Sequence, residues 1–356
     1  MKLALITDTH FGARNDSPAF AQYFDQFYKE VFFPYIDENN IDAVVHLGDI
    51  VDRRKYINYV TARHLDVTLM KPLAKRGLPC HFIIGNHDTY YKNTNKINSM
   101  RELYGNSKYE NFTFYYDKPQ AVDFDGTEIL MTPWICSGNF EDSMEVLKST
   151  SAQILFGHLE IKGFEMYKGA VNDHGFDRSV FDRFDVVCSG HFHHKSTDGN
   201  ITYLGSPYEI TWSDYDDPRG FHVFDTDTRQ LEYIRNPLRL FYKVHYDDTN
   251  KTMEQVVNDN FEQYKNKFVK VIVRDKSNPY WFDMYIDKLE KAGPFSVQVV
   301  EDHLNLDLES DDDIVNEAED TMTILSKYID SMELSTDKKR VEDTIKDLYQ
   351  EALSIT

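Results

Sequence analysis

The stretch 186-VVCSGHFHHKSTD-198 joins a short apolar run to a glycine and then to three histidines. The apolar run 186–188 has the length of a buried strand, and the glycine that follows lets the chain turn sharply. In α/β folds, ligands bind to loops beyond the carboxyl ends of such strands. The stretch therefore predicts a strand followed by a binding loop, in which His191 and His193 are candidate ligands.

Short apolar runs of this kind recur along the first two thirds of the chain. Between the earlier runs lie longer segments with helical spacing, at 20–36 and 61–76. This alternation predicts an α/β domain with largely buried sheets. The apolar runs cover 3–7, 43–47, 81–84, 129–132, 154–156, 186–188, 201–204 and 221–224.

The pattern changes after about residue 236. Strand-like segments there alternate with helical patterns and predict a small β-α-β-α-β unit. We therefore expect a first domain over 1–236 and a second over 237–302. The strands of the second domain are expected at 241–246, 268–273 and 295–300, and its helices at 253–264 and 281–291.

The C-terminal part of the chain is expected to contain a linker and a helical tail. An acidic linker is predicted over 303–320, because residues 301–320 carry ten carboxylates and neither lysine nor arginine. Two short amphipathic helices are predicted near 321–333 and 336–353, within the tail 321–356. This helical hairpin either docks on its own domain or binds a partner protein.

Composition limits the possible partners. The net charge of −21 at pH 7 argues against binding nucleic acid through the overall field of the protein. Basic residues do cluster between 50 and 76, so local patches or a second subunit leave a nucleic-acid partner open. No apolar run reaches the length that crosses a membrane. The three cysteines lie in apolar stretches without metal-finger spacing, which is typical of reduced thiols in a cytoplasmic protein.

Residue types that bind metals follow five of the apolar runs. Most of these strand ends also carry a glycine where the chain must turn. One Gly-His or Asp-x-His pair is weak evidence, but five such ends in one domain predict a shared centre. They are Asp8-Thr-His10, Gly48-Asp49, Gly85-Asn86-His87-Asp88, Gly157-His158 and Gly190-His191-Phe192-His193.

The order of these motifs resembles the calcineurin-like metallophosphoesterases. The last motif, with 203-YLGSP-207 soon after it, is similar to the SbcD-type DNA nucleases of that family. In size, acidic linker and helical tail the chain most resembles the recombination nucleases of T4-like bacteriophages. The resemblance covers nearly the whole chain, with specific motifs over 1–210. It implies a metallophosphoesterase β-sandwich flanked by helices, a small α/β capping domain that positions DNA, and a C-terminal helical hairpin.

The resemblance also implies two divalent metal ions. Mn²⁺ is the expected metal, because mixed imidazole, carboxylate and amide ligands suit manganese, although affinity order alone excludes neither iron nor zinc. Two ions held close together grip a phosphodiester and activate a water for in-line attack, which requires a bridging carboxylate. The family assigns Asp8, His10, Asp49 and His193 to the first ion, and Asp49, Asn86, His158 and His191 to the second.

His87 and Asp52 are the candidate catalytic residues. His87 follows the ligand Asn86, and an imidazole there can stabilise or protonate the leaving oxygen. Asp52 is expected to orient His87 through its carboxylate. Archaeal members of the nuclease family carry a histidine at this position. The stretch 48-GDIVDR-53 is instead similar to protein serine/threonine phosphatases, in which that aspartate pairs with the catalytic histidine.

Two short segments are candidates for substrate binding. The arginines at 53 and 54 could contact phosphates, or they could be solvated surface residues. The aromatic residues beside a lysine at 90–92 could stack on an unpaired base and contact a phosphate, or they could pack the loop. The candidates are Arg53, Arg54, Tyr90, Tyr91 and Lys92.

The resemblance predicts an Mn²⁺-dependent DNA nuclease of recombination, repair and end processing. It implies 3′→5′ exonuclease action on duplex DNA and endonuclease action on single strands. It further implies a homodimer within a heterotetramer, formed through 20–36 or 61–76, in which the C-terminal helices bind an SMC-like ATPase. Two other functions stay open. The stretch 48–53 favours a phosphomonoesterase or protein phosphatase. The third possibility is a protein that regulates the ATPase without catalysis, and the complete set of ligand residues argues against it.

Overall fold

The computed structural model describes residues 1–105, 109–257 and 260–301. The expected acidic linker at 303–320 and the two helices expected beyond it lie outside the described residues. Within the described ranges, no helix is both long enough and apolar enough to cross a membrane.

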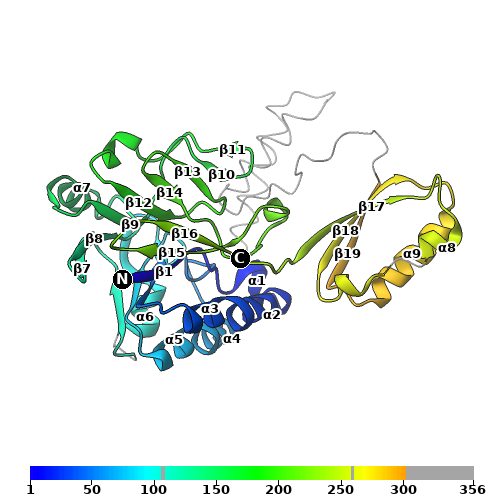
Figure 1. Ribbon diagram of the computed structural model, residues 1–356, viewed down its shortest axis with the longest axis horizontal. Coiled ribbons are helices and arrows are strands. Elements are labelled where there is room, and N and C mark those ends of the chain that lie inside the picture. The colour runs from blue at the N-terminus through cyan, green and yellow to red at the C-terminus, as the bar shows by residue number, and fades with distance from the viewer. Residues whose placement is uncertain (106–108, 258–259, 302–356) are drawn as a thin grey trace, which may run out of the picture. The chain divides into compact units, whose positions relative to one another are not determined.

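Two six-stranded sheets pack face to face and form a sandwich (Figure 1). The cluster between them includes Leu5 and Val45 from one sheet and Phe156 and Cys188 from the other. The expected β-sandwich flanked by helices is therefore confirmed. The first sheet has the order β16 (Leu231–Arg235), β15 (Gly220–Asp225), β1 (Lys2–Ile6), β2 (Ala43–Leu47), β3 (Cys80–Ile83) and β6 (Phe112–Tyr115). The second has the order β13 (Ser196–Asp198), β14 (Ile201–Tyr203), β12 (Val186–Gly190), β9 (Ile154–His158), β8 (Thr127–Thr132) and β7 (Gln120–Phe124).

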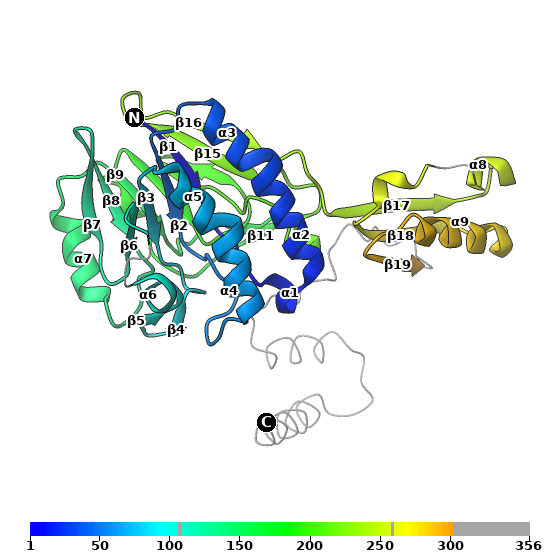
Figure 2. The ribbon, with the colours of Figure 1, turned by 90° about the horizontal axis from the view of Figure 1, so that it is seen from below.

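Two long helical segments cover the outer face of the first sheet (Figure 2). The first begins at Pro18, where a proline loses no helical hydrogen bond. The second begins after Asn58, whose side chain accepts a hydrogen bond from the Val60 amide, and it ends at Gly77 in the left-handed conformation. Both expected helical segments are present, each starting two residues earlier than predicted. They comprise α2 (Pro18–Phe27), a π-helical turn (Tyr28–Phe32) and α3 (Phe33–Glu38), then α4 (Tyr59–Leu65), a second π-helical turn (Asp66–Met70) and α5 (Lys71–Arg76).

The outer face of the second sheet packs against α7 (Phe140–Ser149) and a 3₁₀ turn (Arg178–Phe181). Leu147 and Phe181 of these elements share a core cluster with Leu155 of the sheet. Shorter elements lie in the connections. They are α1 (Ala13–Asp16), β4 (Thr89–Tyr91), β5 (Thr94–Asn98), α6 (Ser99–Tyr104), β10 (Glu165–Tyr167), β11 (Ala170–Val171) and a 3₁₀ turn (Trp212–Asp214).

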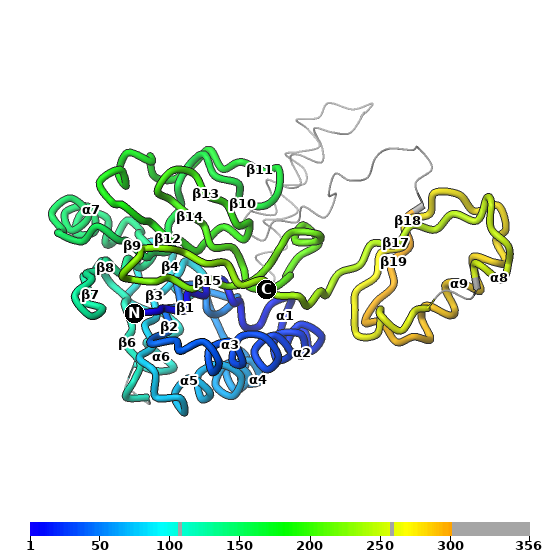
Figure 3. The backbone as a smooth tube through the Cα atoms, in the orientation of Figure 1, coloured from blue at the N-terminus to red at the C-terminus, as the bar shows by residue number. Residues whose placement is uncertain are grey.

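A three-stranded parallel sheet follows the sandwich in the chain (Figure 3). Two helices pack on one face of it, where Val271 and Leu289 share a core cluster. The element order agrees with the expected β-α-β-α-β unit, but the single helix expected over 253–264 is wrong. Asn260 accepts a hydrogen bond from the Glu262 amide and starts a separate 3₁₀ turn. The elements are β17 (Phe241–Asp247), α8 (Met253–Val257), the turn Glu262–Tyr264, β18 (Phe268–Asp275), α9 (Pro279–Lys291) and β19 (Ser296–Glu301).

Candidate metal centre

The five predicted motifs meet because their strands run parallel. In the first sheet β2 lies between β1 and β3 and is parallel to both, and in the second sheet β12 is parallel to β9. The carboxyl ends of parallel strands meet at one edge of a sheet. The sandwich brings the two edges together, so that the main-chain amide of His191 lies 3.1 Å from both carboxylate oxygens of Asp8.

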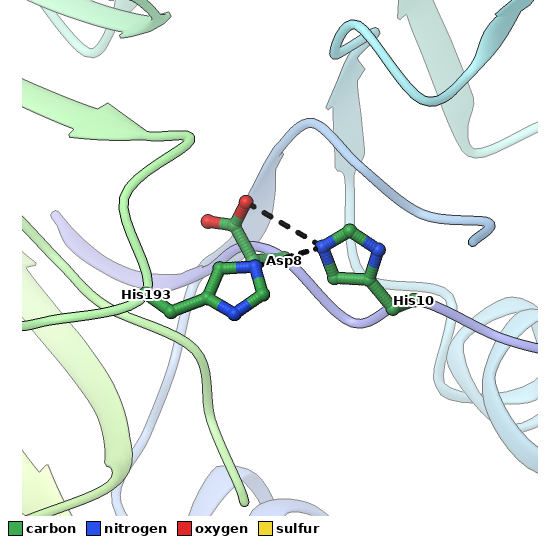
Figure 4. Close-up of side chains that lie close together, drawn as sticks. All are labelled: Asp8, His10 and His193. Carbon is green, nitrogen blue, oxygen red and sulfur yellow. Dashed lines mark hydrogen bonds and ion pairs between the residues drawn. The ribbon is translucent and has the colours of Figure 1, made fainter. Parts of the chain in front are cut away.

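Asp8, His10 and His193 form the first group of potential ligands, with ligand atoms within 4.8 Å of one another (Figure 4). Nε2 of His10 lies 3.0 Å from Nε2 of His193 and 4.0 Å from Oδ1 of Asp8. Asp8 and His10 are buried and His193 is half-buried. The three side chains therefore present one oxygen and two nitrogens to a single point.

Asp49, His158 and His191 form the second group, also within 4.8 Å. Asn86 belongs with them, because its amide oxygen lies 3.0 Å from Nε2 of His158 and 2.9 Å from Nδ1 of His191. The four side chains therefore offer two imidazoles, one carboxylate and one amide oxygen.

Asp49 connects the two groups. Its Oδ2 lies 3.3 Å from Nε2 of His158 in the second group and 3.9 Å from Nε2 of His10 in the first. Its Oδ1 accepts a hydrogen bond of 2.8 Å from the amide of His87, which fixes the carboxylate in this orientation. One carboxylate oxygen therefore faces both groups, as a bridging ligand requires.

Four of the seven candidate ligands have a left-handed backbone. The φ angles are 50° at Asp8, 41° at His10, 53° at Asp49 and 95° at His191. Residues other than glycine rarely adopt such angles, and backbone strain of this kind concentrates at functional sites. The surrounding loops must therefore hold these residues in place against their local preference.

The glycine beside the second group is required by close packing. A Cβ on Gly85 would lie 2.2 Å from Oδ1 of Asp49 and 2.4 Å from its amide nitrogen. Because side chains cannot approach so closely, only glycine allows the loop after β3 to pack on Asp49.

The centre mixes charged carboxylates with protonated imidazoles. Burial, together with the charge of Asp49, raises the pKa of Asp8 to about 6. Burial also opposes the charged forms of His10 and His158, but the neighbouring carboxylates outweigh it and raise both pKa values to about 9. Burial likewise favours the protonated form of Asp49, but the neighbouring histidines, His158 first, hold its pKa well below the usual value. A cation bound by His10 and His158 would take the place of their protons.

His87 lies beside the first group but belongs to neither. Its ring is T-shaped to that of His10, with centroids 4.9 Å apart. Its Nδ1 lies 2.5 Å from the main-chain carbonyl oxygen of Asp52. A carbonyl can only accept a hydrogen bond, so Nδ1 carries the hydrogen and Nε2 is the nitrogen left for a substrate.

The carboxylate of Asp52 does not pair with His87 as expected. Its Oδ1 lies 3.4 Å from Nδ1 of His10, a candidate ligand of the first group. The loops after β1 and β2 pair through the Asp52 amide, which donates to the carbonyl of Phe11 at 3.0 Å. This pairing brings residue 52 beside the loop after β1, so its side chain meets His10 while its carbonyl meets His87.

The two candidate arginines differ in their surroundings. Arg53 pairs with Asp16 at 3.0 Å and donates to the hydroxyl of Tyr56 at 2.8 Å, so its guanidinium is already occupied. Arg54 is half-buried, and its Nη1 is buried without a hydrogen-bond partner among the described residues. Burial lowers the pKa of Arg54, while the negative charge of Asp49 acts in the opposite direction. Of the two, Arg53 already pairs with a carboxylate, whereas Arg54 interacts electrostatically with Asp49 of the centre.

The aromatic candidates lie on a hairpin that follows directly after His87. Tyr90 and Tyr91 of β4 are exposed and contact each other edge to face, with centroids 4.6 Å apart. Lys92 is exposed at the turn. These side chains are presented to solvent, so packing of the loop does not explain them.

Two residues at the centre were missed by sequence reasoning. The ring of Trp134 lies 5.2 Å from that of His191 and 6.1 Å from that of His158, and so covers both imidazoles. Arg219 is buried and donates hydrogen bonds to the carbonyl of His193 and, at 2.9 Å, to the hydroxyl of Ser206. Trp134 follows the strand 127–132, so its place beyond another strand end is the signal that could have found it. No local pattern marks Arg219.

Comparisons with known proteins agree with this geometry. The family model "Calcineurin-like phosphoesterase" matches residues 1–195, which contain all the candidate ligands. The chain is 33% identical over 341 residues to "Exonuclease subunit 1" of Enterobacteria phage T4, covering 96% of this chain and 95% of the relative. It is 25% identical over 268 residues to the D subunit of the nuclease SbcCD of Staphylococcus epidermidis, covering 65% of this chain and 67% of the relative.

Proposed function

Because this chain belongs to the calcineurin-like phosphoesterases, we propose that it is a metal-dependent DNA nuclease. The observation that carries the proposal is one carboxylate, Asp49, that faces two groups of buried and half-buried ligand residues, with His87 beside them. Two relatives are named as an exonuclease subunit and a nuclease subunit, which supports a nucleic acid as the substrate.

The donor set fits two divalent ions. Asp8, His10 and His193 would hold the first, Asn86, His158 and His191 the second, and Asp49 both. Imidazole, carboxylate and amide donors together suit Mn²⁺. When bound, such a pair of ions grips a phosphodiester and lowers the pKa of a water that attacks it.

The chain's own residues supply the rest of the mechanism. His87 is held through Nδ1 by the carbonyl of Asp52, and in its cationic form, with a hydrogen on both nitrogens, it would give the Nε2 proton to the leaving oxygen and become neutral. Arg54 offers a donor to a substrate phosphate, and Tyr90, Tyr91 and Lys92 offer rings and a cation to a displaced strand. We expect 3′→5′ exonuclease action on duplexes and endonuclease action on single strands, as the resemblance to the SbcD-type nucleases implies.

One assay separates this proposal from its alternatives. Purified protein with Mn²⁺ is given an end-labelled duplex, a labelled single strand and, separately, a small phosphate monoester. Shortening of the duplex from its 3′ end, with no release of phosphate from the monoester, is the expected result. Turnover of the monoester alone would replace the proposal with a phosphatase. Inactivity toward all three substrates, even with the partner ATPase added, would indicate that the protein regulates the ATPase and is not itself a catalyst.

We propose that the protein works with an SMC-like ATPase in recombination and repair. Both relatives are named as subunits, which supports a multi-subunit complex. The net charge of −21 opposes binding to DNA, so a partner that supplies DNA-binding surface would strengthen that binding. The tail 321–356, which lies outside the described residues, remains the proposed contact with that ATPase.

The three-stranded sheet carries a feature that suits its proposed role in positioning DNA. Lys243 and Lys270 are direct neighbours on parallel strands, and both alternate with residues that pack against the helices, so they share the opposite face. Their ammonium groups lie 4.9 Å from the ring centre of Tyr215 and 4.5 Å from that of Trp212. The combination of paired cations and aromatic rings suits a nucleic-acid backbone.

Replacing both lysines, Lys243→Ala and Lys270→Ala, is expected to raise the KM for DNA while leaving turnover of a small activated phosphodiester unchanged. Removal of each lysine–phosphate interaction should reduce the dependence of log Kd on log salt concentration by about one. Binding titrations at several salt concentrations measure that slope. The matched control is Lys288→Ala with Lys291→Ala on α9, across the sheet. If both double variants showed the same dependence of log Kd on log salt concentration, this face of the sheet would not contact DNA.

We propose that the protein is a homodimer through the start of α4. The apolar side of 20–36 is buried in its own core, whereas Tyr59 is 93% exposed and Val60 is 72% exposed. Large apolar side chains exposed together mark an interaction surface. We expect a light-scattering mass of twice 41.8 kDa at micromolar concentration, and a mass of 41.8 kDa for Tyr59→Glu with Val60→Glu. A single-chain mass for the unaltered protein would contradict the dimer.

A further inference from the structure

The side chain of His10 has an unusual environment for a candidate metal ligand. It is 4% exposed, and its Nε2 faces Asp8 and His193. Its other nitrogen, Nδ1, is buried without a regular hydrogen bond to any described residue. Oδ1 of Asp52 is the acidic oxygen that approaches this nitrogen, at 3.4 Å.

The main chain explains why Asp52 meets His10. The Phe11 amide donates to the carbonyl of Ile50 at 2.9 Å, and the Asp52 amide donates to the carbonyl of Phe11 at 3.0 Å. These two bonds hold residue 52 next to the turn that carries His10. The two acceptor groups of Asp52 therefore face different histidines. Its carboxylate faces His10, and its main-chain carbonyl faces His87.

We infer that Asp52 is a positioning residue of the first metal site, acting through His10, and that it supports His87 by its main-chain carbonyl alone. The inference rests on the proposed function only in taking this centre as a metal site. A histidine that binds a metal through Nε2 must carry its hydrogen on Nδ1. A carboxylate beside Nδ1 fixes that tautomer and the direction of the ring.

Two replacements of Asp52 are expected to weaken metal binding to different extents. Asp52→Ala removes the acceptor from His10 but keeps the main-chain carbonyl at His87. Loss of such an acceptor typically weakens metal binding about 10–100-fold. Asp52→Asn keeps an oxygen that can accept from Nδ1, so it should weaken binding less than Asp52→Ala.

Titration with Mn²⁺, followed by the electron paramagnetic resonance signal of the free ion, tests the inference without DNA. For Asp52→Ala we expect one of two Mn²⁺ equivalents to bind about 10–100-fold more weakly, and the other to bind as in the unaltered protein. Nuclease activity lost at low Mn²⁺ should return as the Mn²⁺ concentration rises. His87→Gln is the control, and it should bind both equivalents normally.

Two results would overturn the inference. Asp52→Ala and Asp52→Asn could both bind two Mn²⁺ normally and yet lose turnover at saturating Mn²⁺, which would assign the carboxylate to His87. Equal weakening of both equivalents in a variant that is folded would show that the carboxylate does not act on the first site alone. Circular dichroism checks folding, and Asp52→Asn, which is nearly isosteric, carries the test if Asp52→Ala does not fold. An unaltered protein that binds two Mn²⁺ but cleaves no DNA would overturn the proposed nuclease and leave this inference standing.

Discussion

An Asp49→Asn variant is expected to lose about 10³-fold in kcat/KM for DNA cleavage. This loss corresponds to about 4 kcal/mol, because a pair of bridged ions supplies several kcal/mol of charge stabilisation in the transition state. Oδ2 of Asp49 lies 3.9 Å from Nε2 of His10 and 3.3 Å from Nε2 of His158, so under the proposed function it would be shared by the two ions. An amide at this position provides one neutral oxygen in place of a charged, shared one. Steady-state kinetics at fixed Mn²⁺, with metal content measured in parallel, gives the size of the loss.

Folding and metal content show whether the loss has this cause. Asparagine can keep the hydrogen bond that Oδ1 accepts from the His87 amide, so the loop after β3 should stay in place. Burial and the charge of Asp49 raise the pKa of Asp8, which means that the two buried carboxylates repel each other without metal. The buried histidines, however, hold the pKa of Asp49 well below its usual value, so its charge stabilises the fold, and we expect metal-free Asp49→Asn to melt at a lower temperature while it stays folded at the assay temperature. Asp142→Asn, exposed on α7, is the control, and a normal rate for Asp49→Asn with two bound ions would contradict a bridging role.

The positions of the candidate ligands could be predicted because local sequence encodes them. Each lies where a buried strand ends, and the alternation of strands with helices indicated a fold in which such ends meet. Asp8 and His193 are 185 residues apart in the chain, but each is next to its own apolar run and turn. The long helices were predicted for the same reason, since their helical spacing is a local signal.

Contacts that depend on how two loops pair could not be predicted. The identity of Asp52 indicated an orienting carboxylate, but the main-chain bonds to Phe11 decide that it meets His10. Arg53 was a substrate candidate by position, and its pairing with Asp16 requires a left-handed turn on a different loop. Arg219 reaches the carbonyl of His193 from a third segment. In each case the partner is fixed by tertiary geometry, which no spacing in the sequence records.

A His87→Gln variant is expected to lower kcat for DNA cleavage by about 10²–10⁴-fold, the usual contribution of a positioned general acid. Both Mn²⁺ equivalents should bind normally, because His87 belongs to neither ligand group. The hydrogen on Nδ1 is held by the carbonyl of Asp52, so the cationic ring, protonated on both nitrogens, would deliver its proton from Nε2. An activated phosphodiester with a nitrophenol leaving group needs no such proton. We therefore expect the variant to lose far less activity on that substrate than on DNA.

The ratio of the two losses decides what His87 does. A general acid gives a large loss on DNA and a small one on the activated ester, because only the DNA alkoxide must be protonated as it leaves. A residue that only stabilises charge on the phosphate would give equal losses on both substrates. His64→Gln is the matched control, because His64 pairs with Asp25 at 2.8 Å on the helical side of the first sheet. Equal losses on the two substrates would leave His87 as an electrostatic group, and the proton for the leaving oxygen would have to come from water.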